Sequence, residues 1–99
     1  MFKELKETIG LMNSKDYKER FVAEYWQTKI RYEKLKNFCD KIEVGYVTHN
    51  EPEHDCPLDM LREQQRLMGQ TLHILELRAI IENIDLNQDI KSNDTVFKK

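Results

Sequence analysis

The sequence predicts an all-α fold: a long antiparallel hairpin of two helices, preceded by a short helix. Only three glycines and two prolines occur among the 99 residues, which favours long uninterrupted helices over a turn-rich β fold. Apolar residues recur at alternating steps of three and four along two long stretches. About a dozen mostly polar residues join these stretches, and a connection of that length lets two helices fold back on each other.

The composition indicates one small, well-solvated domain. Charged residues make up 34% of the chain, and the mean hydropathy is −0.75. The net charge of −2 gives no general attraction to DNA or to an anionic membrane, so neither partner is expected. No apolar run approaches the length of a transmembrane helix, and we expect no signal peptide. These features favour a cytoplasmic location.

Residues 1–13 form the first predicted unit, a short helix or arm. An amphipathic helix is indicated by apolar residues at steps of three, four and three: Phe2, Leu5, Ile9 and Met12. Two interpretations stay open. The arm either docks onto another subunit, or it is a frayed leader, since Met12 is itself a possible start of the chain.

Residues 14–86 form the predicted hairpin domain. Its first helix is expected from about residue 15 to residue 43, with Asn13 or Ser14 as the N-terminal cap and Gly45 as the signal that ends it. One apolar stripe follows this helix at steps of four and three: Phe21, Tyr25, Thr28, Tyr32, Leu35, Cys39 and Ile42. We expect this stripe to pack against the second helix.

The second helix is expected over about residues 57–84, after a polar connection at residues 46–57. Pro57 suits the first position of a helix, and Asp59 complements the positive end of the helix dipole. The apolar stripe of this helix is interrupted only by Gln65: Leu58, Leu61, Met68, Leu72, Leu75 and Ala79. Residues 87–99 lose the periodicity and predict a weakly ordered tail.

A further set of apolar residues on the second helix predicts self-association. It runs down another side of the helix: Leu67, Ile74, Leu77 or Ile81, and Ile84. From Leu72 onward the helix is therefore apolar on more than one face, and such a helix has to be covered by several neighbours. A chain this short can supply few of them. We therefore expect a homo-oligomer that assembles through residues 72–84.

The connection contains side chains that can bind metals, but not at the spacing of a metal site. His49, His54 and Cys56 lie there without the C-x2-C or H-x3-H pairs of structural zinc sites, so we predict a solvated acidic loop and no metal. Cys39 falls on an apolar stripe, where a thiol behaves as a small hydrophobe. Cys56 is explained by its position at the start of a helix. The sequence therefore predicts no catalytic residue, no cofactor, no disulfide and no enzyme activity.

Basic and aromatic residues alternate along the first predicted helix. Seven Lys or Arg residues and four acidic residues lie between Lys15 and Lys36, a local excess of +3. Aromatic planes stack on bases while Lys and Arg pair with phosphates, so this mixture suits a nucleotide or a single-stranded nucleic acid. The candidate binding residues are Trp26, Lys29, Arg31 and Tyr32. The alternative is that the tyrosines belong to the core and the charged residues only face water.

Two stretches of the chain resemble known phage proteins. The segments DYKERFVAEYWQTKIRYEKL and CPLDMLREQQRLMGQTLHILELRAIIENIDL are similar to small phage and prophage proteins that are labelled by their relation to a gene product of a crAss-like phage. The resemblance covers about residues 16–86. Its most specific pieces are Arg20-Phe21 with Glu24-Tyr25, Cys56-Pro57, Gln65 with Met68, and Arg78-Ala79 with Glu82. The chain before Met12 and the tail after Leu86 fall outside it.

The two-helix layout is, more remotely, similar to anti-CBASS and anti-Thoeris helical-hairpin proteins of phages. Those proteins assemble into oligomers and sequester cyclic nucleotide immune signals without cleaving them. The resemblance implies a non-enzymatic sponge for such a signal. The candidate contacts are chosen from this chain's own residues and are not matched to those proteins: Trp26, Lys29, Arg31, Tyr32 and Arg78. The alternative is a helical interaction protein that binds a host or phage protein. A small DNA-binding regulator is disfavoured by the net charge and by the lack of a helix-turn-helix pattern.

Arg31 and Arg78 each border a predicted packed face, where an unpaired charge is costly. Glu82 lies one helical turn beyond Arg78, and Glu24 lies two turns before Arg31. Two hypotheses follow from this arrangement. The arginines either form structural ion pairs that fix the register of the hairpin, or at least one of them is left free to meet a phosphate.

Overall fold

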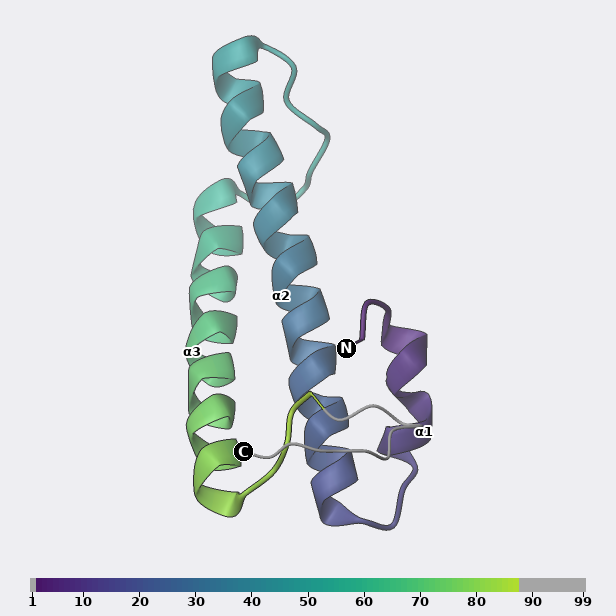
Figure 1. The fold of residues 1–99 in the computed structure, drawn as a ribbon. Helices are drawn as coiled ribbons and strands as arrows, with labels where there is room; N and C mark the ends of the chain where they lie inside the picture. Colours follow the sequence, from purple (N-terminus) through teal and green to yellow (C-terminus); the bar gives the residue numbers. More distant parts are fainter. Residues whose placement is uncertain (1, 88–99) are drawn as a thin grey trace.

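The computed structural model describes residues 2–87, which form a long helical hairpin with a short helical segment packed against it (Figure 1). The elements follow in the order η1 (Leu5–Thr8, a 3-10 helix), α1 (Ile9–Met12), α2 (Tyr17–Thr48) and α3 (Leu58–Glu82). The two long helices run antiparallel and side by side, and residues 2–87 contain no strand. The predicted all-α hairpin is confirmed.

The N-terminus of α2 lies slightly later than predicted because a different residue caps it. The side chain of Asp16, not of Asn13 or Ser14, accepts a hydrogen bond from the backbone N–H of Lys18 at 3.0 Å. The Ser14 hydroxyl accepts instead from the backbone N–H of Asp16 at 2.9 Å. Serine therefore shapes the turn that precedes the helix, and aspartate satisfies one of the free donors of its first turn.

Gly45 does not end α2, as the sequence suggested, but lies inside it, and the helix continues to Thr48. The helix ends where His49 adopts a left-handed conformation with φ of 60°. A Cβ atom at Gly45 would lie 2.5 Å from the Cα atom of Glu51. The glycine is therefore needed because the returning chain passes directly over the helix at this point, and not because the helix stops there.

His54 fastens the connection between α2 and α3. Its Nδ1 atom lies 2.6 Å from the carbonyl oxygen of Cys56, and its Nε2 atom lies 2.5 Å from Oε2 of Glu51. The ring also meets Phe38 of α2 edge-on, with centroids 6.3 Å apart. The hydrogen bond to the Glu51 carboxylate, and then that to the Cys56 carbonyl, raise the pKa of His54. Both ring nitrogens face acceptors, an arrangement that favours the imidazolium form.

α3 begins one residue after the predicted start and ends two residues before the predicted end. Asn83 closes it in a left-handed conformation with φ of 60°, which asparagine tolerates better than most residues. The backbone N–H of Ile84 then donates to the carbonyl of Ala79 at 2.8 Å. Ile84 is buried, so the chain turns back toward the hairpin after α3.

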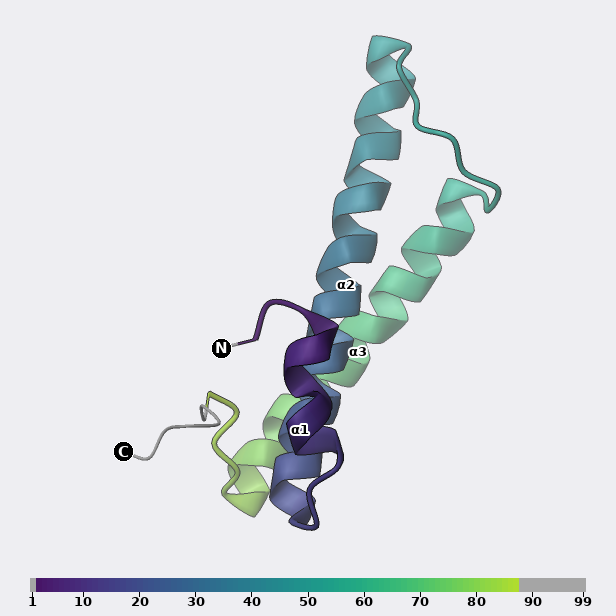
Figure 2. The ribbon, with the colours of Figure 1, turned by 90° about the vertical axis from the view of Figure 1, so that its right-hand side faces the viewer.

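The N-terminal segment, residues 2–12, packs against α2 of its own chain (Figures 1 and 2). Thr8 is fully buried, and its hydroxyl accepts a hydrogen bond from Nε2 of Gln27 at 3.0 Å. Ile9 and Met12, which were predicted to be on the packed face, are exposed, whereas Leu11 is buried. A 3-10 turn has three residues per turn, so the packed face differs from the one that a regular α-helix would present.

The core lies on two sides of α2, with α3 on one side and the N-terminal segment on the other (Figure 1). One connected cluster of buried residues joins the three parts: Phe2, Leu11, Phe21, Val22, Ala23, Tyr25, Trp26, Ile30, Leu72, Leu75, Ala79 and Ile84. The predicted α3 positions Leu72, Leu75 and Ala79 are all in this cluster. The periodicity of the two long helices therefore identified the faces that pack together.

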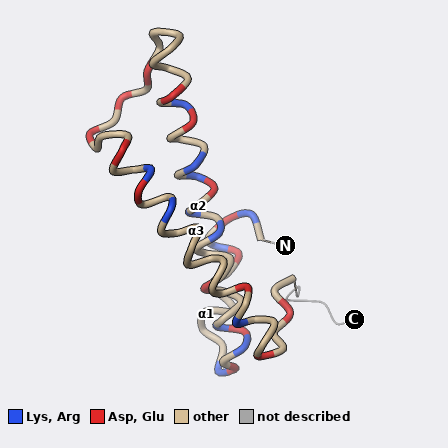
Figure 3. The backbone as a smooth tube through the Cα atoms, turned by 90° about the vertical axis from the view of Figure 1, so that its left-hand side faces the viewer, with Lys and Arg blue, Asp and Glu red and all other residues tan. Residues whose placement is uncertain are grey.

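The remaining surface carries interspersed charges. Lys and Arg residues alternate with Asp and Glu residues along both long helices (Figure 3). In residues 2–87, no helix has both the length and the apolar character to cross a membrane. The predicted tail from residue 88 onward lies outside the described residues.

Candidate functional site

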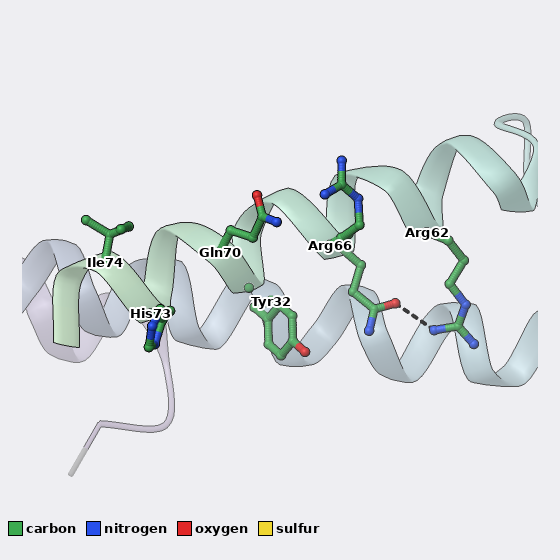
Figure 4. Close-up of a pocket in the computed structure, with 8 residues that line it drawn as sticks. Tyr32, Arg62, Arg66, Gln70, His73 and Ile74 are labelled. Carbon is green, nitrogen blue, oxygen red and sulfur yellow. Dashed lines mark hydrogen bonds between the residues drawn. The ribbon is translucent and has the colours of Figure 1, made fainter. Parts of the chain in front are cut away.

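An open groove of about 790 Å³ runs along α3 (Figure 4). Only Tyr32 comes from α2, and seven residues of α3 complete the lining: Arg62, Gln65, Arg66, Gly69, Gln70, His73 and Ile74. The groove thus combines one aromatic ring, two arginines and several polar side chains that can form hydrogen bonds. These are the groups that bind the base and the phosphate of a nucleotide.

Tyr32 and Gly69 form the floor of the groove. A Cβ atom at Gly69 would lie 3.3 Å from Cε1 of Tyr32, closer than most such contacts. Because Gly69 has no side chain, the half-buried tyrosine ring can lie directly against α3. The ring is thereby fixed at the junction of the two helices and remains partly open to the groove.

Arg62 closes one end of the groove and is held firmly. Its Nη1 donates to Oε1 of Gln65 at 2.6 Å, and its Nη2 donates to Oδ1 of Asp40 at 2.9 Å and also contacts Glu43. The hydrogen bonds to Glu43 and then Asp40 raise the pKa of Arg62. The hydrogen bonds that Asp40 accepts from Lys36 and then from Arg62 lower the pKa of the Asp40 carboxyl group. This network joins α2 to α3 and fixes the orientation of the guanidinium.

Arg66 is held much less firmly. Its guanidinium pairs with Glu63, three residues earlier on the same helix, and both side chains are 55% exposed. Exposed pairs of this kind contribute little, and water or another anion readily replaces one partner. In Figure 4 the side chains of Arg66, Gln70 and Ile74 project from α3 away from α2. Arg66 is therefore the arginine of the groove that can turn toward a bound anion.

The predicted contacts Trp26 and Lys29 lie at a different cleft, of about 340 Å³, beneath the N-terminal segment. Trp26 is only 6% exposed, and its Nε1 donates to the carbonyl oxygen of Leu86 at 2.5 Å. Phe2 meets the indole edge-on, with centroids 6.1 Å apart. Lys29 is 3.8 Å from Glu33, as its i,i+4 spacing suggests. The tryptophan thus packs between the two ends of the described chain, at Phe2 and Leu86.

The predicted contacts Arg31 and Arg78 line neither of these hollows. Arg31 is exposed on α2. Arg78 donates to the Tyr17 hydroxyl at 2.7 Å and to Oε2 of Glu82 at 3.2 Å, and its guanidinium lies 5.0 Å from the centroid of the Phe21 ring. The predicted pairing of Arg78 with Glu82 is confirmed. One chain therefore does not bring the five predicted contacts together: Tyr32 stands alone in the groove.

Sequence reasoning did not single out the groove residues of α3. Arg62, Arg66, Gln70 and His73 were not predicted as binding residues, because charged and polar residues on a helix usually face water. Two signals were present: Gln65 interrupts the apolar stripe, and Gly69 is the only glycine of α3. Each indicates that α3 leaves its simple packing pattern at this point of the hairpin.

The loop residues show no metal arrangement. Within residues 2–87, no group of three or more His, Cys, Asp or Glu side chains is placed to hold a metal ion. Cys39 is buried and Cys56 is exposed, and both are free thiols.

Comparison with known proteins gives one match. The family model described as Sequestin matches residues 15–81, which include α2, most of α3 and every residue that lines the groove. The N-terminal segment lies outside the matched region. No curated protein and no solved structure matches the chain. Since the family model covers well over half of the sequence, the chain belongs to the Sequestin family.

Proposed function

We propose that this protein sequesters a cyclic nucleotide immune signal in the groove between α2 and α3, and that it holds the signal without cleaving it. The family name denotes a sequestering, binding protein, which supports the general part of the proposal. The observation that carries the choice of ligand is the placement of the Tyr32 ring in one groove with Arg66. The tyrosine ring can stack on the base of a nucleotide, and the loosely held arginine can turn toward its phosphate.

Each lining residue of the groove would contact a particular part of the nucleotide. Tyr32 offers one ring to a base, and Gln70 and His73 offer hydrogen bonds to the edge of that base. Arg66 exchanges Glu63 for a phosphate, because the exposed pair is easily broken and an arginine binds phosphate through two parallel hydrogen bonds. Arg62 adds a second positive charge at a fixed position.

The proposal requires no chemical step. Stacking, hydrogen bonding and charge are enough to lower the free concentration of a signal, provided that the protein is abundant and the complex is stable. A phage-encoded protein with this role acts in the cytoplasm of the host, where such a signal is made. Self-association is part of the same proposal, because Ile74, Leu77 and Ile81 leave an apolar face of α3 exposed.

A thermal-shift screen tests the proposal. The purified chain is heated with cyclic dinucleotides, cyclic trinucleotides and cyclic ADP-ribose isomers, each in excess. A ligand at about 100 times its Kd stabilises the fold by about 2.7 kcal/mol, which is easily seen for a domain of this size. Mass spectrometry of the nucleotide recovered from the complex should find its mass unchanged. If no member of the panel raises the melting temperature, the cyclic nucleotide proposal is wrong.

Two pairs of variants locate the site. Tyr32→Phe keeps the stacking ring and should bind as the unaltered chain does, whereas Tyr32→Leu should bind less. Arg66→Gln should weaken binding by about tenfold or more, since a charged hydrogen bond is lost. Arg31→Gln is the matched control because Arg31 lies outside the groove. Loss of binding in Arg31→Gln with full binding in Arg66→Gln would place the site on the outer surface of α2.

The second candidate function is that of a helical interaction protein for a host or phage protein. The exposed apolar residues of α3 favour it, because they would suit a partner helix equally well. This function is supported if the nucleotide panel leaves the melting temperature unchanged and the purified chain is a monomer. In that case the apolar face is free for a different protein.

A further inference from the structure

One face of α3 carries large apolar side chains that the other described residues, 2–87, do not cover. We call it the outer stripe: Leu67, Ile74, Leu77 and Ile81, which are 48%, 53%, 43% and 81% exposed. Leu72, Leu75 and Ala79 of the same helix are buried against α2, so the outer stripe lies on the side of α3 that faces away from the hairpin. The N-terminal segment cannot cover it, because that segment packs on the other side of α2 (Figure 1).

The spacing of the outer stripe suits an identical helix. Leu67, Ile74 and Ile81 follow each other at intervals of seven residues, the repeat that keeps two long helices in contact. Between Leu67 and Leu77 the polar side chains beside these residues are Gln70 and Thr71, and neither carries a charge. A two-fold pairing brings the same surface of each copy together, so an uncharged apolar stripe meets its copy without like-charge repulsion. The occupant that this surface fits is a second copy of the chain.

The groove and the outer stripe share an edge. Ile74 belongs to both, and Gln70, which lines the groove, lies between Leu67 and Ile74 on the outer side of α3. Arg66, Gln70 and Ile74 project from α3 away from α2 (Figure 4). Whatever packs on the outer stripe therefore stands beside Gln70 and Ile74, at the edge of the groove that Arg66 also lines.

We propose that a second copy of this chain packs on the outer stripe and forms the missing wall of the groove, so that pairing of two copies and binding of the ligand support each other. The ligand part rests on the proposed function, whereas the pairing stands on the outer stripe alone. The second wall removes water from around Arg66, and a charge pair with a phosphate is stronger where water is excluded. A ligand that contacts both walls binds only the pair, and it therefore shifts the equilibrium toward the pair.

The pairing is tested on the full chain by sedimentation velocity at micromolar concentration. Ile81→Glu places a charge on the outer stripe but not in the groove lining. Val47→Glu is its matched control, since Val47 is equally exposed, at 79%, on α2 and far from the stripe. We expect the mass of a dimer for the unaltered chain and for Val47→Glu, and the mass of a monomer for Ile81→Glu with unchanged helical content. A monomeric unaltered chain, or a dimeric Ile81→Glu, overturns the proposal.

The wall is tested without a ligand by the alkylation of a thiol in the groove. Gln70→Cys is placed in a Cys56→Ser background, and its rate of alkylation is followed by mass spectrometry in the presence and absence of Ile81→Glu. We expect several-fold slower alkylation in the paired protein, because the second copy covers residue 70. Equal rates would show that the pair leaves the groove open and would overturn the proposal.

The coupling is tested with whichever cyclic nucleotide stabilises the chain. We expect Ile81→Glu to bind it at least about tenfold more weakly, which corresponds to about 1.4 kcal/mol, and Val47→Glu to bind it normally. A monomeric variant with full affinity would show that one chain is a complete site. If no nucleotide binds the unaltered chain, the proposed function fails, while the sedimentation and alkylation results still decide the pairing and the wall.

Discussion

The hydroxyl of Tyr25 on α2 donates a hydrogen bond of 2.8 Å to Oε2 of Glu76 on α3, and so joins residues that lie 51 positions apart in the sequence. The tyrosine is 6% exposed. Its burial, and then the bond to the Glu76 carboxylate, raise the pKa of its hydroxyl, so the phenol stays protonated and keeps donating. A hydroxyl on the packed face of α2 thus fixes the register of the two helices.

Replacing Tyr25 by phenylalanine should therefore destabilise the hairpin. The ring stays in the core, but a hydrogen bond to a carboxylate is lost, and we expect a cost of about 1 kcal/mol, or a decrease of about 4–8 °C in melting temperature. Circular dichroism during heating measures it. Tyr46→Phe is the control because Tyr46 is exposed near the end of α2. An equal effect of both substitutions would argue against a specific role for the Tyr25–Glu76 bond.

Gly45→Ala should destabilise the protein even though alanine is the better helix former. The added methyl group would lie 2.5 Å from the Cα atom of Glu51, so the loop has to move, at a cost of about 1–3 kcal/mol. Gly10→Ala is the matched control, since a Cβ atom there has no neighbour within 4 Å. That variant should be unchanged or more stable by up to about 1 kcal/mol. Chemical denaturation of both variants measures the difference.

Arg78→Gln should lower the melting temperature of the ligand-free protein, and Arg31→Gln should not. Arg78 bonds to Tyr17 and lies over the Phe21 ring, so its removal breaks two contacts between α2 and α3, and it also breaks the bond to Glu82 within α3. Arg31 is exposed. Differential scanning calorimetry compares the two. If Arg78→Gln instead weakens ligand binding while the melting temperature of the free protein stays the same, Arg78 is a phosphate contact.

The stability of the chain should fall with rising pH through the titration of His54. The raised pKa in the folded state means that the charged ring stabilises the fold. This contribution is fully present below the unfolded pKa of about 6.5 and is lost as the pH rises through the higher folded pKa. His54→Gln should remove this part of the pH dependence of the melting temperature, whereas His73→Gln should retain it. A parallel pH profile for the unaltered chain and His54→Gln would contradict this role.

The architecture was predictable because the two long helices repeat their apolar residues over many turns. Such a pattern places the packed faces reliably, and Leu72 and Leu75 are buried as it required. The helix ends were less predictable. The meaning of Gly45 depends on Glu51, which returns over it from the loop, and no local pattern of residues 40–48 reports that approach.

The candidate site was only partly predictable for a related reason. Tyr32, which lines the groove, was predicted as a contact because aromatic residues interleaved with basic ones suit a nucleotide. Arg62 and Arg66 were not found, since charged residues on a helix normally face water. What distinguishes them is the Tyr32 ring lying against Gly69, a contact between two helices that a single helical pattern does not contain.

The packing of Trp26 has a practical consequence for spectroscopy. It is the only tryptophan of the chain, and it contacts Phe2 from one end of the described chain and the Leu86 carbonyl from the other. Its fluorescence therefore reports whether both ends are docked, while circular dichroism reports the long helices. A red shift of the emission that precedes the loss of helical signal during heating would reveal release of the ends as a separate step. The unlabelled protein thus carries its own optical probe, and Trp26 is not among the residues that line the groove.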